Sequence, residues 1–210
     1  IPTARFQVVD IPADIQRVRL PYPLFVKPVA EGTAKGISAR SVVKTPVDLA
    51  RECRRLLATY EQPVLVETLL TGREVTVGMI GTGEQAEAIG TLEILLLPHA
   101  EAQAYTYLNK ENSEELCRYT LAEGDLAAGA EELALRAWRG LGCRDGGRVD
   151  LRADAEGRLH VLEINPLPGL HPEHSDLPIL CTAAGISYVE LIRRIVESAS
   201  VRVCRTASAC

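Results

Sequence analysis

Short apolar runs that alternate with polar residues predict a chain rich in β-strands. Strands are expected at residues 4–9, 24–29, 38–43, 64–68, 74–80 and 86–96. Two further runs, 147–151 and 159–164, flank a turn at 154–157 and predict a hairpin. Since short turns join most of these strands, an antiparallel sheet is the simplest interpretation.

Helical spacing of apolar residues occurs in three stretches, 47–60, 126–141 and 188–198. Their expected inward faces are Leu49, Cys53, Leu56 and Leu57 in the first, Leu133, Ala137, Trp138 and Leu141 in the second, and Val189, Ile192, Ile195 and Val196 in the third. Pro46 suits the first turn of the first helix, and Gly142 suits the end of the second. The polar stretch 109–124 is expected to be a long loop, and the last dozen residues a loose tail.

Helices mixed with mostly antiparallel strands predict an α+β fold. The sequence Leu-Leu-Thr-Gly, within residues 69–73, marks a seam between two small lobes, 1–70 and 71–197, with 198–210 as the tail. A cleft between two lobes is a usual place for a small ligand.

Composition narrows the class of protein. With 210 residues, 47% hydrophobic and 24% charged, the chain has the balance of a soluble globular protein, which excludes disorder, collagen and coiled coil. The net charge of −5 argues against nucleic acid or anionic lipid as a partner, and no apolar stretch approaches the roughly 20 residues that span a membrane. A small ligand or a protein partner is favoured instead.

Cysteine usage and the first residue add two further expectations. Six cysteines are scattered without a CxxC pair, so neither a zinc site nor a disulfide framework is indicated, and reduced thiols in the cytoplasm are expected. The chain begins at Ile1 and its only methionine is Met79, which suggests a fragment or a trimmed chain.

A first group of polar residues follows the strand at 24–29. The sequence FVKP places Lys27 at the end of this strand, and EGTAKG at 31–36 follows as a glycine-bounded loop with a hydroxyl. A cation beside a loop of backbone N–H donors can hold phosphates. The GxxxxGK[ST] spacing of a P-loop is absent, and a plain turn between strands is the alternative.

A second group lies in VLVETLLTGRE, residues 64–74. Glu67 closes an apolar strand and Glu74 follows seven residues later. Such carboxylates can accept hydrogen bonds from an amine or a sugar diol. They are also typical of solvated strand ends.

The third group is the most specific. Arg148 and Asp150 lie on one strand of the predicted hairpin, and Glu163 and Asn165 end the other. Glu163 and Asn165 face the same way because side chains alternate along a strand, so both can converge with Asp150. Two carboxylates and a carboxamide suit Mg²⁺, which takes few protein ligands together with substrate phosphates. Scattered charges on an exposed hairpin are the alternative.

Four motifs in this order carry a family resemblance: FVKPVAEGTAKG, VLVETLLTGRE, GRVDL and VLEINPLPGL, followed by HSDLPIL and a closing helix. Together they resemble the ATP-grasp ligases, and within these the D-alanine:D-alanine ligase group, over residues 1–197. The resemblance implies an ATP-grasp fold, in which two α+β lobes clasp ATP in the cleft between them. It also implies a cytoplasmic, peptide-bond-forming ligase of cell-wall peptidoglycan synthesis that phosphorylates one carboxylate and joins it to an amine.

The resemblance implies a role for each matching residue. For ATP these are Lys27 at the phosphates, Glu31, Gly32, Thr33 and Gly36 in the closing loop, Glu67 and the backbone at Leu70 at the adenine, and Glu74 at the ribose. Asp150, Glu163 and Asn165 would hold two Mg²⁺ ions, with Mn²⁺ as an alternative metal. Arg148 and the backbone N–H of Gly169 would stabilise the oxyanion, and Ser175 would bind a substrate carboxylate.

The polar stretch 109–124 matches the family's lid. Tyr107-Leu108-Asn109-Lys110 resembles the segment whose lysine reaches the transferred phosphate, which gives Lys110 a catalytic role as well as an ATP contact. Only four of the 23 basic residues are lysines, and Lys27, Lys35 and Lys110 fall at nucleotide-facing positions. Water exclusion by such a lid protects an acyl phosphate.

The match departs from the family around the substrates. The N-terminal domain of family members is absent from this sequence, Glu111 replaces a tyrosine after the lid lysine, and the loop with His171 and His174 is one residue longer. These departures leave open a ligase for other amino acids, or a nucleotide-binding module or fragment without catalysis. ATP and small amino acids are the expected partners, without nucleic acid or membrane, and a homodimer is left open.

Overall fold

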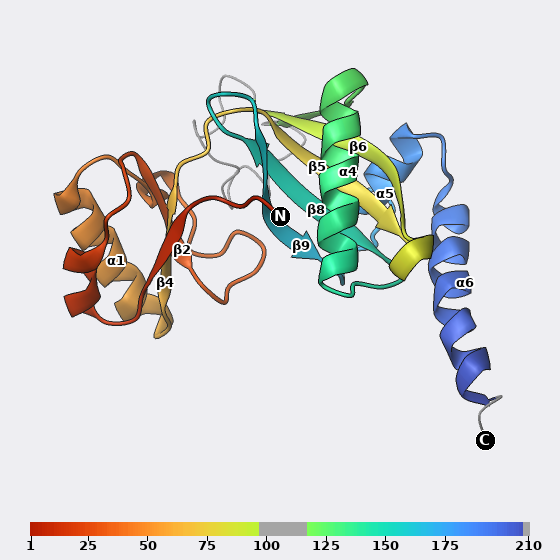
Figure 1. The fold of residues 1–210 in the computed structure, drawn as a ribbon, viewed down its shortest axis with the longest axis horizontal. Coiled ribbons are helices and arrows are strands. Elements are labelled where there is room, and N and C mark those ends of the chain that lie inside the picture. Colours follow the sequence, from red (N-terminus) through yellow and green to blue (C-terminus); the bar gives the residue numbers. More distant parts are fainter. Residues whose placement is uncertain (97–116, 208–210) are drawn as a thin grey trace. The chain divides into compact units, whose positions relative to one another are not determined.

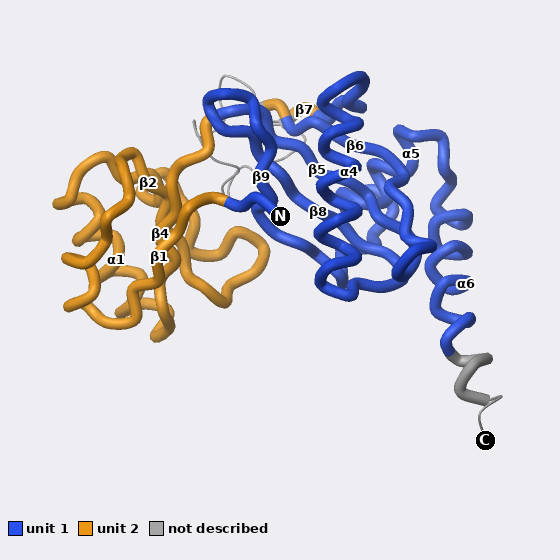
Figure 2. Tube along the Cα trace, viewed as in Figure 1, with its two compact units in different colours: residues 1–3, 72–94, 119–210 blue, residues 4–71, 95–118 orange. Residues whose placement is uncertain are grey.

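The computed structural model describes residues 1–96 and 117–207 (Figure 1). The chain divides into two compact units, one of residues 1–3, 72–94 and 119–210 (unit 1) and one of residues 4–71 and 95–118 (unit 2), which Figure 2 colours separately. Each unit is built on its own antiparallel sheet, so the predicted α+β class is confirmed.

Unit 2 is a four-stranded sheet with one helix. Its elements are β1 (Phe6–Val9), η1 (Pro12–Arg17), β2 (Leu24–Pro28), η2 (Ala39–Ser41), β3 (Val42–Val43), α1 (Pro46–Tyr60) and β4 (Val64–Thr68). The strand order is β1-β4-β2-β3, with every neighbouring pair antiparallel. Of the expected strand at 38–43 only the last two residues form a strand, because Ala39–Ser41 form a 3-10 turn that Ser38 caps.

Helix α1 forms where its sequence provides a start, an apolar stripe and a stop. The Thr45 hydroxyl accepts the N–H of Asp48 at 3.1 Å, and Pro46 occupies the first helical position. Leu49, Cys53 and Leu56 are buried against the sheet, as their spacing predicts. The helix ends at Glu61, which adopts a left-handed conformation.

Unit 1 is a five-stranded sheet with helices on both faces. Its elements are β5 (Glu74–Ile80), η3 (Gly83–Gln85), β6 (Glu87–Leu96), β7 (Cys117–Leu121), α4 (Gly124–Gly140), β8 (Gly146–Ala153), β9 (Leu159–Asn165), α5 (Asp176–Ala183) and α6 (Tyr188–Ala207). The last two residues of β6 and the first two of β7 are counted with unit 2. The strand order is β7-β6-β5-β8-β9.

Helix α4 lies across one face of this sheet, as Figure 1 shows. It buries Val77 and Val149 together with its own Trp138, which is fully buried and donates its indole N–H to the carbonyl of Gly81 at 3.1 Å. On the other face, Leu177 and Leu180 of α5 approach Gly78 of β5. A methyl group at Gly78 would lie 2.9 Å from Leu180 and 3.2 Å from Leu177, so the glycine permits this close packing.

Four expectations about unit 1 are wrong. Residues 117–121, expected within a loop, form edge strand β7, while 109–116 lie outside the described residues. The tail expected from residue 198 is helical as far as Ala207. Leu141 is 72% exposed because α4 ends one residue earlier, and Val189 and Val196 of α6 face solvent while Leu191 is buried.

Helix α5 carries no prediction from the sequence, although its residues are strongly apolar. Among the helices of residues 1–96 and 117–207, none has both the length and the apolar composition to cross a membrane.

Candidate active site

The polar residues of the third sequence group lie on one face of three neighbouring strands in unit 1. Arg148 and Asp150 of β8 share this face with Glu163 and Asn165 of β9 and with Thr76 of β5. The residues between them point to the opposite face and pack under α4. Strict alternation along β5 and β8 therefore separates a dry core from a polar surface on the same strands.

A β-bulge sets which residues of β8 and β9 stand opposite each other. Arg148 pairs with Asn165 and Asp150 with Glu163, and the register then shifts between Asp150 and Leu151. The shift keeps Glu163 and Asn165 directly across from the arginine and the aspartate. Bulges of this kind often aim side chains at functional sites.

Hydrogen bonds draw the two carboxylates and the carboxamide together. The amide of Asn165 donates to Asp150 Oδ2 at 3.0 Å and to Glu163 Oε1 at 3.3 Å. The Thr76 hydroxyl donates to Asp150 Oδ1 at 2.6 Å. Asp150, Glu163 and Asn165 thus converge as their placement on the hairpin predicts.

Arg148 is held from both sides. Its Nη2 lies 2.8 Å from Asp150 Oδ2, its Nη1 lies 2.7 Å from Asp176 Oδ2, and its Nε donates to Thr76 Oγ1 at 3.0 Å. Burial alone would lower the pKa of Arg148, but the carboxylates of Asp150 and Asp176 outweigh burial and raise it. The guanidinium is therefore a fixed positive charge, and each terminal nitrogen keeps a second N–H.

The polar face carries more negative than positive charge. Among residues 1–96 and 117–207, this face carries four carboxylates, those of Glu74, Asp150, Glu163 and Asp176, and two guanidinium groups, those of Arg148 and Arg152. Burial raises the pKa of Glu74, Arg152 at 3.2 Å lowers it, and the neighbouring Asp150 and Glu163 raise it further. An excess of carboxylates over guanidinium groups on this partly buried part of the described chain favours a bound cation.

The donor set suits a hard cation. Asp150, Glu163 and Asn165 offer two carboxylates and one amide oxygen, which a half-turn of the amide presents in place of its nitrogen. Within residues 1–96 and 117–207, no group of three or more histidine, cysteine, aspartate or glutamate side chains has the arrangement of a metal site. A cation at this position would therefore need the Asn165 amide beside the two carboxylates.

A tight turn precedes α5 beside this face. The Ser175 hydroxyl accepts the N–H of His171 at 3.0 Å, and the Ser175 N–H donates to the His171 carbonyl at 3.1 Å. A side chain at Gly169 would come within 2.6 Å of the Ser175 hydroxyl, so Gly169 and Ser175 are packed closely. The rings of His171 and His174 stack with centroids 4.6 Å apart.

The residues expected to contact nucleotide divide between the units. In unit 2, Lys27 of β2 pairs with Glu67 of β4, with Nζ and Oε2 2.9 Å apart, and the carboxylate is 9% exposed. Leu70 is buried after β4, whereas Glu74 begins β5 in unit 1. Lys110, like Glu111, lies outside the described residues.

The loop 31–36 has an unusual backbone. Thr33 and Ala34 have φ values of 52° and 58°, in the left-handed region that a β-branched residue rarely adopts. Gly36 also has a positive φ, and a side chain there would collide with Pro28. The Glu31 carboxylate accepts the amide of Gln62 at 2.9 Å. Strained backbone is characteristic of ligand-binding loops.

Two residues of this site are not among those to which the sequence assigns a role. Thr76 lies inside an apolar strand, and Asp176 lies within HSDLPIL at the start of an unpredicted helix. Only the spatial contacts of Arg148 identify them.

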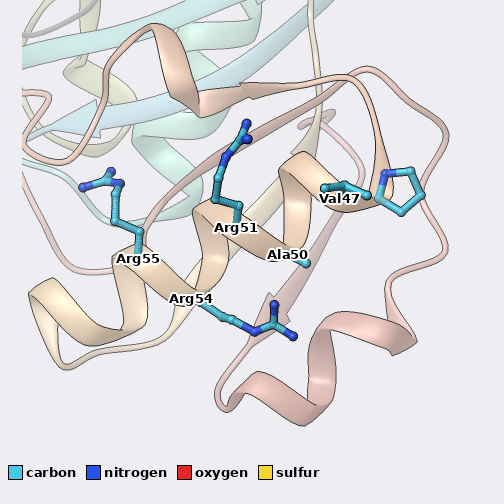
Figure 3. A pocket seen from close by; sticks show the side chains of 6 residues that line it. Val47, Ala50, Arg51, Arg54 and Arg55 are labelled. Carbon is cyan, nitrogen blue, oxygen red and sulfur yellow. The ribbon is translucent and has the colours of Figure 1, made fainter.

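A shallow groove also lies on the outer side of α1 (Figure 3). Pro46, Val47, Ala50, Arg51, Arg54 and Arg55 line it. Arg51 pairs with Asp48 and Arg55 with Glu52 on the same helix, and none of the predicted site residues is part of this lining.

A comparison with models of protein families shows to which family the chain belongs. The family model described as D-ala D-ala ligase C-terminus matches residues 5–197, which is nearly the whole chain. The chain belongs to the D-alanine:D-alanine ligase family. The resemblance carried by the four motifs is thereby confirmed.

Relatives with high coverage are D-alanine–D-alanine ligases. The protein from Bordetella petrii is 38% identical over 205 residues, covering 96% of this chain and 60% of the relative. The protein from Bordetella avium is 33% identical over 208 residues, covering 97% and 62%. The chain therefore spans about three fifths of the length of these D-alanine:D-alanine ligase relatives.

Solved structures confirm the ATP-grasp fold. The D-alanine–D-alanine ligase from Bacillus anthracis complexed with ATP matches with a TM-score of 0.70 at 22% identity, over 99% of this chain and 63% of that one. The VanG D-Ala:D-Ser ligase from Enterococcus faecalis matches with a TM-score of 0.74 at 22% identity, over 94% and 57%. Both structures thus share the fold of this chain.

Proposed function

We propose that this chain is the ATP-grasp portion of a ligase that joins two amino acids at the expense of ATP, with D-alanine as the first candidate for both. The observation that carries the proposal is the group on β8 and β9: a fixed arginine beside two carboxylates and a carboxamide that favour a cation. Family membership supports the reaction type, since the relatives are D-alanine–D-alanine ligases.

In the proposed reaction, a carboxylate oxygen of the first amino acid attacks the terminal phosphorus of ATP. ADP leaves, and an acyl phosphate forms. The amine of the second amino acid then attacks the acyl carbon, and phosphate leaves with the former carboxylate oxygen as the peptide bond forms. Most of the work that remains for the protein is positioning and charge neutralisation.

Arg148 is suited to the negative charge that develops during both steps. The carboxylates of Asp150 and Asp176 fix its plane, and the remaining N–H on each terminal nitrogen is available to an oxyanion. A donor that is already oriented stabilises such charge without reorganising. We assign the backbone N–H of Gly169 to the same oxyanion and the Ser175 hydroxyl to the substrate carboxylate.

Asp150, Glu163 and Asn165 are the residues that would hold magnesium, with manganese as an alternative. When bound, the ions would neutralise the phosphate oxygens and orient them. The excess of negative charge around Glu74, Asp150 and Glu163 supports this assignment.

In unit 2, we assign Lys27 and the loop 31–36 to the phosphates, and Glu67 and Leu70 to the adenine. Support comes from the Lys27–Glu67 pair, which holds the ammonium at the end of a buried strand pair, and from the strained backbone at Thr33. We assign the ribose to Glu74 and the transferred phosphate to Lys110.

A ligase for other amino acids is the second candidate. The stacked rings of His171 and His174 adjoin Ser175, the residue assigned to substrate, and so favour a pocket with its own selectivity. In either case we expect a protein of the cytoplasm that acts in cell-wall or related metabolism, without nucleic acid or membrane as partner. A homodimer is compatible with both.

The test is phosphate release from Mg²⁺-ATP by the protein in its full natural length, screened against D- and L-amino acids singly and in pairs. Release that requires D-alanine supports the first candidate, and release with another pair supports the second. ATP binding without release under any amino acid contradicts the ligase proposal and favours a non-catalytic nucleotide-binding module.

A further inference from the structure

Asp176 is a buried carboxylate to which the proposed reaction gives no chemical step. It is the first residue of α5 and is 8% exposed. Its Oδ2 lies 2.7 Å from Nη1 of Arg148, and its Oδ1 accepts the hydroxyl of Tyr119 at 3.4 Å. A carboxylate in this environment is costly to bury unless the pair with arginine compensates it.

The contact with Arg148 differs from the one that Asp150 makes. Asp150 binds Nε and Nη2, which form one edge of the guanidinium, and it lies two residues away on the same strand. Asp176 binds Nη1, the terminal nitrogen that Asp150 leaves, and it comes from another element. With Asp150 alone the arginine could pivot about that edge, whereas the second carboxylate fixes the plane.

Asp176 also adjoins the turn 169–175, which carries Ser175, the residue assigned to the substrate carboxylate. Ser175 precedes it directly, and the hydroxyl of Ser175 is locked to the N–H of His171 while packing against Gly169. The Ser175 carbonyl also accepts the N–H of Ile179, which anchors the turn to α5. A displacement of Asp176 would therefore carry Ser175 with it.

We propose that Asp176 is a positioning residue: it orients Arg148 and ties the turn 169–175 to strand β8, so that the oxyanion donor and the substrate hydroxyl keep a fixed separation. This inference rests on the proposed ligase function. It adds a residue that acts through Arg148 and Ser175 rather than on the reacting atoms.

Three variants of the full-length protein test the role. Asp176→Asn keeps the shape and removes the charge, Asp176→Glu restores the charge, and Asp145→Asn is the matched control. Asp145 is also a carboxylate of unit 1 paired with an arginine, Arg202, but it contacts neither Arg148 nor the turn. Loss of a hydrogen bond to a charged group is worth about a tenfold effect or more.

We expect kcat of Asp176→Asn to fall about tenfold or more and the KM for amino acid to rise, with little change in the KM for ATP. Asp176→Glu should recover part of kcat. Asp145→Asn should lower the unfolding temperature and leave the kcat of the folded enzyme unchanged. A wild-type kcat in folded Asp176→Asn, or equal kinetic effects in Asp176→Asn and Asp145→Asn, would overturn the proposal.

A spectroscopic measurement separates this claim from the ligase claim. If the wild-type protein shows no ligase activity, the proposed function fails, and the side-chain nitrogen resonances of Arg148 still test Asp176. These resonances, assigned by their loss in Arg148→Lys, should be resolved in the wild type because carboxylates hold both terminal nitrogens. They should merge in Asp176→Asn, and identical spectra of the two proteins would refute the positioning role.

Discussion

Gly147 offers a sharp test of the packing beneath the candidate site. A methyl group at this position would lie 2.5 Å from the carbonyl oxygen of Asn165 and 2.6 Å from Cζ3 of Trp138. Ordinary contacts of this kind are nearly one ångström longer, and neither neighbour can yield easily. Trp138 is fully buried with its indole N–H on Gly81, and Asn165 ends β9 opposite Arg148.

Gly147→Ala should therefore be strongly destabilising. Overpacking of a core costs about 1–3 kcal/mol, and displacement of the Asn165 carbonyl disturbs the end of the β8–β9 ladder as well. We expect the free energy of unfolding to fall by about 3 kcal/mol, near the top of that range. For a chain of this size, this corresponds to a fall of about 6–12 °C in unfolding temperature. Weaker Mg²⁺-ATP binding should accompany it because Asn165 moves.

Gly129→Ala is the matched control. Gly129 lies inside α4, and a methyl group there would meet only Leu159, at an ordinary 3.8 Å. The same substitution should stabilise this helix by about 0.5–1 kcal/mol. Thermal and urea unfolding followed by the fluorescence of Trp138, the only tryptophan, reports both changes in unit 1. Equal unfolding temperatures for Gly147→Ala and wild type would refute the packing argument. A fall in the unfolding temperature of Gly129→Ala as large as that of Gly147→Ala would refute it too.

Three further results are expected. Glu163→Gln and Asn165→Ala should each weaken Mg²⁺-ATP binding by roughly tenfold or more in calorimetry while leaving the circular dichroism spectrum intact, and unchanged binding in both would disprove the metal assignment. The guanidinium of Arg202 lowers the pKa of Asp145, so this pair stabilises the fold above the unfolded-state pKa of about 4 and loses its effect as pH falls through the lowered value. The difference in unfolding temperature between wild type and Asp145→Asn should therefore shrink below about pH 4, and a constant difference would contradict this expectation. Burial, with a smaller contribution from Glu52, raises the pKa of the Cys53 thiol to about 12, so at about pH 8 its alkylation, followed by mass spectrometry, should be far slower than in denaturant, whereas equal rates would show that unit 2 opens readily.

The sequence predicts elements well where local signals agree. Helix α1 combines a capping threonine, a proline at its start and an apolar stripe, and the hairpin of β8 and β9 combines alternation with a clear turn. Helix α6 runs past Ser198, and its Arg202 pairs with Asp145 just before β8, a contact that no local pattern shows. The polar surroundings of β7 predict a loop, although Cys117–Leu121 alternates as a strand does.

In the candidate site, too, local patterns predict some of the contacts, whereas only tertiary packing produces the others. Asp150, Glu163 and Asn165 could be grouped from the sequence because period-two alternation and one hairpin fix their relative positions. The β-bulge that places Glu163 opposite Asp150 has no sequence signal here. Asp176 lies 28 residues from Arg148, so only the packing of α5 on the sheet brings the two together.

The central claim is that ATP phosphorylates a carboxylate, and an isotope measurement tests it most directly. The full-length protein is given Mg²⁺-ATP and D-alanine, or the amino acid pair that the screen identifies, with ¹⁸O in the carboxylate of the first substrate. Because the acyl phosphate breaks at its carbon–oxygen bond when the amine attacks, the released phosphate should carry one ¹⁸O atom. Unlabelled phosphate, formed together with ADP, would show that water receives the phosphoryl group and would contradict the ligase account.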